Sequence, residues 1–142
     1  MYNIGFTLGD PSSDGHGMTK EFHIETSHSA QEITNAYKKA TEKLGWNYTT
    51  SICSEYEDST IDLEQVEDIE NKLNIDIKGC LSDWQIRELK RKGYCYLDCY
   101  PFIDIFFEIV SSEIPKFQWK EVDFNEDRLH SLDGAGYGLF SN

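Results

Sequence analysis

The sequence predicts an α+β fold, a single domain in which an antiparallel sheet is packed on one face by three or four helices. Two observations lead to this prediction: runs with the period of a strand lie near both ends of the chain, and runs with the period of a helix lie between them. The expected order is β-β-α-β-α-α-α-β-β, and a mixed sheet stays open as an alternative. The 142 residues suit one domain, 1–142, with one hydrophobic core.

The first two strands are expected at residues 2–8 and 20–26. In the first, apolar side chains alternate with polar residues and glycine, and "KEFHIET" repeats the alternation in the second. The stretch "DPSSDGHG", residues 10–17, lies between them. Asp-Pro and Asp-Gly pairs are typical of turns, so the two strands are expected to form a long antiparallel hairpin.

Four helices are expected in the middle of the chain. Ser29 and Glu32 have the spacing of a capping box, and Gly45 suits the end of the same helix. Ser82 and Gln85 repeat the box, and Gly93 suits the end of that helix. The expected helices are residues 29–44, 62–74, 82–92, and a strongly apolar helix that begins at Pro101 and ends before Pro115. The further expected strands are residues 46–52, 116–124 and 136–140.

Charge is the strongest signal in the composition. The chain carries 26 acidic and 13 basic residues, a net charge of −13, which opposes direct binding to nucleic acid. Residues 51–81 hold nine acids and two bases, a net charge of −7, whereas residues 82–93 hold four bases and two acids, a net charge of +2. One short basic helix is therefore expected among acidic surfaces.

The leading hypothesis is a non-catalytic interaction protein of the inhibitor, immunity or anti-defence type. Its acidic surface would occlude a basic protein partner, such as a nuclease, another protein that handles nucleic acid, or a toxin. No cofactor is predicted. A second acidic stretch, Asp123 to Asp127, is expected to contribute. The predicted partner-binding residues are Glu55, Glu57, Asp58, Asp62, Glu64, Glu67, Asp68 and Glu70.

The alternative is a small enzyme or ligand-binding protein that depends on a metal or a small molecule. Asp10, Asp14, His16 and His23 supply metal-type ligands within a short stretch, and the glycine-rich segment 133–140 would form the opposite wall. Their spacing matches no established metal motif, so a plain turn is favoured. A third hypothesis is a homo-oligomer, in which the basic helix docks on an acidic face of a second copy.

The expected compartment is the cytosol. The first residues, "YNIGFTLGD" after Met1, lack the pattern of a signal peptide, and the most apolar run, residues 94–110, contains three acidic residues. The four cysteines show no CxxC pair, so they are expected to be thiols rather than disulfides or zinc ligands.

Overall fold

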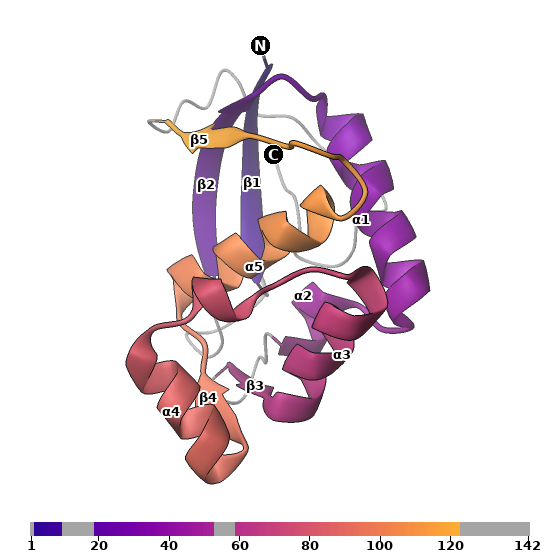
Figure 1. Cartoon of the computed structure of the whole chain (residues 1–142). Coiled ribbons are helices and arrows are strands. Elements are labelled where there is room, and N and C mark those ends of the chain that lie inside the picture. Colours follow the sequence, from indigo (N-terminus) through magenta and orange to yellow (C-terminus); the bar gives the residue numbers. More distant parts are fainter. Residues whose placement is uncertain (1, 10–18, 53–58, 123–142) are drawn as a thin grey trace.

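The computed structural model describes residues 2–9, 19–52 and 59–122 (Figure 1). These residues form an α+β fold, as predicted. Strands β1 (Tyr2–Gly9), β2 (Thr19–Thr26) and β5 (Trp119–Glu121) make an antiparallel sheet in the order β1-β2-β5. Strands β1 and β2 pair antiparallel, as predicted, with Ile4 opposite Ile24, and both of these side chains are fully buried. The predicted turn between the two strands lies outside the described residues.

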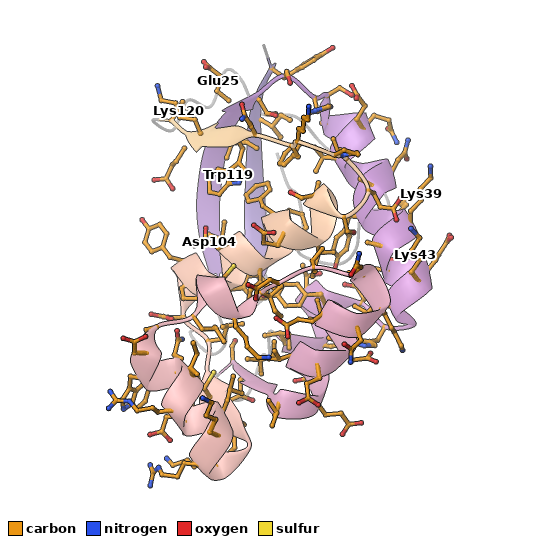
Figure 2. All side chains as sticks on the ribbon, in the orientation of Figure 1. Glu25, Lys39, Lys43, Asp104, Trp119 and Lys120 are labelled. Carbon is orange, nitrogen blue, oxygen red and sulfur yellow. The ribbon has the colours of Figure 1, made fainter. Side chains whose placement is uncertain are left out.

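Helix α5 (Cys99–Ser111) crosses the face of this sheet (Figure 1). The sequence predicts it as the most apolar helix, and the structure buries its Phe102, Phe106 and Ile109 completely. Figure 2 shows Trp119 pointing from β5 toward α5, where its ring stacks on Phe107 with centroids 4.4 Å apart. The buried apolar side chains of the described residues belong to one cluster, so this helix and the sheet share a core.

Three further helices start at capping boxes. Helix α1 (Ala30–Leu44) begins after Ser29 and α4 (Asp83–Lys92) after Ser82, both as predicted, and α3 (Leu63–Leu73) begins after Asp62. Gly45 and Gly93 follow α1 and α4 with φ of 86°, a left-handed conformation that glycine adopts without strain. The short 3₁₀ helix η1 (Lys78–Cys80) joins α3 to α4.

The predicted strand at residues 46–52 is wrong, because Tyr48–Ile52 forms a short helix, α2. The alternation of large side chains suggested a strand, but the buried residues are Tyr48, Thr49 and Ile52, which follow helical spacing. The Asn47 side chain accepts the backbone N–H of Thr49 at 3.2 Å, and its carbonyl accepts that of Ser51 at 3.0 Å. Asn47 thus acts as a helix cap, a role that asparagine often fills.

A second, two-stranded sheet was not predicted. Strands β3 (Thr60–Asp62) and β4 (Tyr94–Tyr96) pair antiparallel, with Ile61 opposite Cys95, and both of these side chains are buried. The backbone N–H of Leu97 adds a bond to the carbonyl of Ser59 at 3.0 Å. This small sheet joins β4, which follows α4, to the strand that leads into α3 (Figure 1).

Helix α5 begins at Cys99 rather than at Pro101, so the proline is the third helical residue, where its missing N–H still costs no helical bond. The predicted strand at residues 136–140 lies outside the described residues.

Among the helices that the structure describes, none combines the length and the apolar character that crossing a bilayer requires.

Candidate functional site

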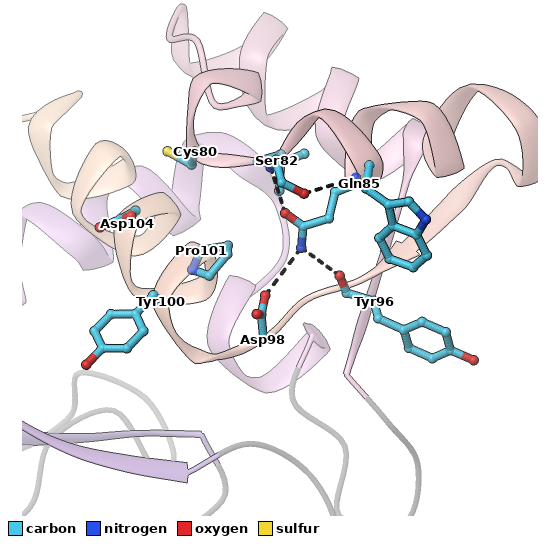
Figure 3. A pocket seen from close by; sticks show the side chains of 10 residues that line it. Cys80, Ser82, Gln85, Tyr96, Asp98, Tyr100, Pro101 and Asp104 are labelled. Carbon is cyan, nitrogen blue, oxygen red and sulfur yellow. Dashed lines mark hydrogen bonds between the residues drawn. The ribbon is translucent and has the colours of Figure 1, made fainter.

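A cavity of about 610 Å³ opens where the start of α4, the end of β4 and the start of α5 meet (Figure 3). Its size lies within the range of ~300–1,000 Å³ that is usual for binding sites in proteins. The lining residues all fall between positions 80 and 104, and Cys80 of η1 lines one side. The lining residues are Cys80, Leu81, Ser82, Trp84, Gln85, Tyr96, Asp98, Tyr100, Pro101 and Asp104.

The buried amide of Gln85 organises the centre of this cavity. As the third residue of α4, Gln85 accepts the backbone N–H of Ser82 at 2.8 Å, which completes the capping box. Its amide nitrogen then donates to the carbonyl of Tyr96 at 2.9 Å and to the Asp98 carboxylate at 3.3 Å (Figure 3). One side chain therefore joins the start of α4 to β4 and to the residue that precedes α5.

Asp98 occupies the N-cap position of α5 but makes no side-chain cap bond to that helix. Aspartate is among the residues preferred at this position because its oxygen accepts a free N–H of the first turn. Here the carboxylate is turned toward Gln85 and lines the cavity instead. Since α1, α3 and α4 all have side-chain caps, α5 is the exception among the long helices of the described region.

Exposed aromatic side chains surround the cavity. The exposed fractions are 53% for Trp84, 48% for Tyr96 and 55% for Tyr100. Figure 3 shows the rings of Tyr96 and Tyr100 on opposite sides of Asp98. Tyr94 lies next to this group, with its ring edge-on to Tyr96 at 6.2 Å. Tryptophan and tyrosine that are exposed and grouped around a hollow are typical of residues that dominate binding energy at interfaces.

The wall near Cys80 is acidic. Burial raises the pKa of the Asp104 carboxyl, and burial together with the negative charges of Asp76 and Asp104 raises the pKa of Glu108. The pKa of the Cys80 thiol is raised to about 12, chiefly by burial and then by Glu108, Asp104 and Asp76. Cys80 is consequently a neutral thiol at pH 7 and a poor nucleophile.

Replacing Glu108 with glutamine is expected to raise the melting temperature at pH 7. Because the folded-state pKa lies above the ordinary 4.5, the stability penalty of the charged form is absent below 4.5, grows as the pH rises and is complete above the folded pKa. Solvent screens this exposed group, so we expect a gain of roughly 1–3 °C. Thermal unfolding followed by circular dichroism at pH 7 and pH 4 measures it. A gain of the same size at both pH values would contradict an electrostatic origin.

The predicted acidic surface is only partly available for a partner. Asp62 caps α3, Asp68 accepts the Trp46 indole N–H at 2.8 Å, and Glu70 pairs with Lys78 at 3.1 Å. The Trp46 hydrogen bond, followed by Lys72, lowers the pKa of Asp68. These three carboxylates already make contacts within the protein, so they are less available to a partner. Glu64 and Glu67 are exposed on α3, whereas Glu55, Glu57, Asp58 and the stretch from Asp123 to Asp127 lie outside the described residues.

The alternative ligand residues are not brought together in the described structure. Asp10, Asp14, His16 and the glycine-rich segment 133–140 lie outside the described residues, and only the backbone of His23 is placed, in β2 opposite Gly5. Among residues that the structure describes, no group of three histidine, cysteine, aspartate or glutamate side chains is arranged to hold a metal. The metal or small-ligand hypothesis therefore stays untested.

The predicted basic helix is present as α4, and its charges gather at one end. Lys90, Arg91 and Lys92 lie in the last turn, where cations interact favourably with the helix dipole. Arg91 and Lys92 both pair with the nearly buried Glu88, at 3.0 and 3.2 Å. The cavity is at the opposite end of the same helix. The negative charge of the cavity is thus separated from the main basic group of the described structure.

The sequence reasoning missed the residues that line this cavity. One signal was available: Trp84 is a large aromatic residue among the polar residues of α4, and it is 53% exposed. A tryptophan at such a position lacks a core role. Tyr94 and Tyr96, which precede and follow the buried Cys95 in β4, are likewise exposed to solvent. These residues are grouped with Asp98 by the hydrogen bonds of the Gln85 amide to Tyr96 and Asp98, which the sequence pattern did not predict.

The fold and this site together define a class: an α+β protein with an acidic cavity rimmed by exposed aromatic side chains. No protein-family model matches the chain, and no significant similarity to a curated protein or to a solved structure was found.

Proposed function

We propose that this protein is a non-catalytic binding protein that docks on a basic protein partner and occludes its surface, as inhibitors and immunity proteins do. The observation that carries the proposal is the cavity beside α4. There the Asp98 and Asp104 carboxylates lie among the exposed rings of Trp84, Tyr96 and Tyr100. Aromatic anchors, together with carboxylates that pair with no cation among the described residues, complement a partner surface that is rich in arginine and lysine.

The net charge of −13 supports the same proposal in a different way. A strongly negative protein attracts a positive partner over a distance of about one Debye length, ~8–10 Å, which raises the association rate. Glu64 and Glu67 are exposed on α3 and contribute to this field, although they do not line the cavity. The cavity would therefore provide the specific contacts, and the acidic surface would steer the partner. We propose that both proteins meet in the cytosol.

The test is affinity capture from a lysate of the source cell, with the purified protein as bait. The bait is used unchanged, as the Asp98→Asn, Asp104→Asn double variant, and as the His16→Ala, His23→Ala double variant. We expect the unchanged bait and the histidine variant to retain one basic protein that elutes as salt increases, because screening weakens exposed ionic contacts. The asparagine variant should lose most of this protein.

Two results would contradict the proposal. In one, the asparagine variant retains the basic protein as well as the unchanged bait does, so that the cavity is not the contact. In the other, mass spectrometry finds a stoichiometric metal or small molecule, bound only when His16 and His23 are present, and no protein partner. That second result would favour a site around residues 10–17. Thermal unfolding of each bait shows whether the variants are folded.

A further inference from the structure

We propose that the cavity binds an arginine side chain of the basic partner, with the guanidinium group against the aromatic rim and hydrogen-bonded to Asp98. This inference rests on the proposed function, because it names the part of the partner that enters the cavity. Three features carry it: a carboxylate that is hydrogen-bonded to a buried amide, aromatic side chains around that carboxylate, and negative charge in the wall.

The exposed carboxylate of Asp98 accepts a hydrogen bond from the Gln85 amide at 3.3 Å before any ligand arrives. The Gln85 amide that bonds to it is itself fixed by the Ser82 backbone N–H at 2.8 Å and the Tyr96 carbonyl at 2.9 Å. Ionised aspartate has about four acceptor sites, and the Gln85 bond uses one of them. The group can therefore accept two N–H donors from a guanidinium while it keeps its bond to Gln85.

The aromatic rim suits a flat cation. Trp84, Tyr96 and Tyr100 are each about half exposed, so their rings remain accessible to a ligand. A cation within about 6 Å of such a ring is attracted by the negative face of the π-system, and this attraction increases as water is excluded. Guanidinium also stacks on aromatic rings because it is planar and only weakly hydrated.

The wall beside Cys80 lacks a matching positive charge in the described structure. Asp104 lines the cavity, and its charge and that of Asp76 both raise the pKa of Glu108. Lys78 pairs with Glu70 on α3 and also interacts with Asp76, so its positive charge is directed to those two carboxylates rather than to Asp104. An incoming cation would reduce the repulsion between Asp104 and Glu108. The protein therefore gains a favourable electrostatic interaction by binding a cation here.

Arginine fits this set of groups better than lysine or a methylated lysine does. An ammonium group is compact and strongly hydrated, so it gains less from stacking on rings. A trimethylammonium group suits an aromatic cage but has no N–H to donate to Asp98. Only guanidinium uses both the rings and the carboxylate of Asp98. The structure thus leads to an order of affinity: arginine first, then lysine and trimethyllysine, and a neutral isostere last.

The experiment titrates the unaltered protein with four blocked tripeptides of the form Gly-X-Gly, where X is arginine, lysine, trimethyllysine or citrulline. Citrulline has almost the shape of arginine but no charge. Two-dimensional NMR follows the indole N–H of Trp84 and the side-chain amide of Gln85. The indole N–H of Trp46 is an internal control, because it is bonded to Asp68 away from the cavity.

We expect the arginine peptide to shift the Trp84 and Gln85 signals saturably, with an affinity at least three times that of the lysine and trimethyllysine peptides. The citrulline peptide should cause no saturable shift, and Trp46 should not move with any peptide. In the Asp98→Asn variant the arginine affinity should fall about tenfold, the effect usual for loss of a charge-assisted hydrogen bond. A preference for trimethyllysine, or equal binding of citrulline, would overturn the inference.

These results separate the inference from the proposed function. If the arginine peptide leaves Trp84 and Gln85 unchanged while a basic protein is still captured through Asp98 and Asp104, the inference fails and the proposed function stands. If the arginine peptide binds but no basic protein is captured, the cavity is a guanidinium site and the proposed function fails.

Discussion

The Trp84→Ala variant is expected to bind the basic partner roughly 30-fold to 1,000-fold more weakly than the unaltered protein, the range found when an aromatic hot spot is truncated. Trp84 is 53% exposed before binding, so it has contact area available for a partner. Its removal should change the free energy of unfolding by less than about 0.5 kcal/mol, because the residue lies on the solvent side of α4. Calorimetric titration with the captured partner measures the affinity, and thermal unfolding measures the stability.

Tyr2 provides the matched control for this variant. It is an aromatic residue that is 45% exposed, but it lies in β1 and does not line the cavity. The Tyr2→Ala variant should bind the partner within about twofold of the unaltered protein, because surface residues outside a hot spot contribute little. Equal losses in both variants would show that aromatic exposure in general, and not this cavity, determines the affinity.

The largest effect on stability is expected from the Phe106→Ala variant. Phe106 is fully buried in α5, with its ring centroid 5.1 Å from those of both Tyr37 and Phe107. Truncation of a buried phenylalanine costs about 3–5 kcal/mol through lost burial and the cavity that remains. Since domains are stable by only about 5–15 kcal/mol, much of the total would be lost. The midpoint of urea unfolding measures the change.

A milder replacement at the same position separates lost volume from other causes. The Phe106→Leu variant keeps most of the apolar volume, so its loss should be well under half of the loss in Phe106→Ala. If both variants were equally unstable, the specific ring contacts with Tyr37 and Phe107 would matter more than the filled volume. If neither were destabilised, the placement of α5 at the centre of the core would be wrong.

Much of the fold was predictable because the local signals agree with the tertiary structure. The Ser29 and Ser82 capping boxes, the terminal glycines Gly45 and Gly93, and the apolar run of α5 were all assigned from sequence and are all present. The short elements could not be predicted in this way. In α2, five residues carry too few apolar positions to distinguish alternation from a helical turn, and the Asn47 cap decides the outcome.

The candidate site was harder to predict than the fold. Its residues lie between positions 80 and 104, and the hydrogen bonds of the Gln85 amide to Tyr96 and Asp98 join the start of α4 to the segment that leads into α5. The acidic residues of α3 were predicted to bind a partner because charge can be read directly from a sequence. However, Asp62, Asp68 and Glu70 serve as a cap, an indole acceptor and an ion-pair partner. Composition counts such carboxylates without showing which ones the fold already uses.

The position of the Asp98 side chain has a consequence for protein engineering. Methods that search for thermostable variants favour well-capped helices, and a side chain that capped α5 would add about 1 kcal/mol of stability. Serine at position 98 is a choice that such a search would make, since Ser29 and Ser82 already cap α1 and α4. The result would be a more robust protein whose cavity lacks the carboxylate that Gln85 now holds. A library intended to preserve binding should therefore keep position 98 fixed and seek stability elsewhere.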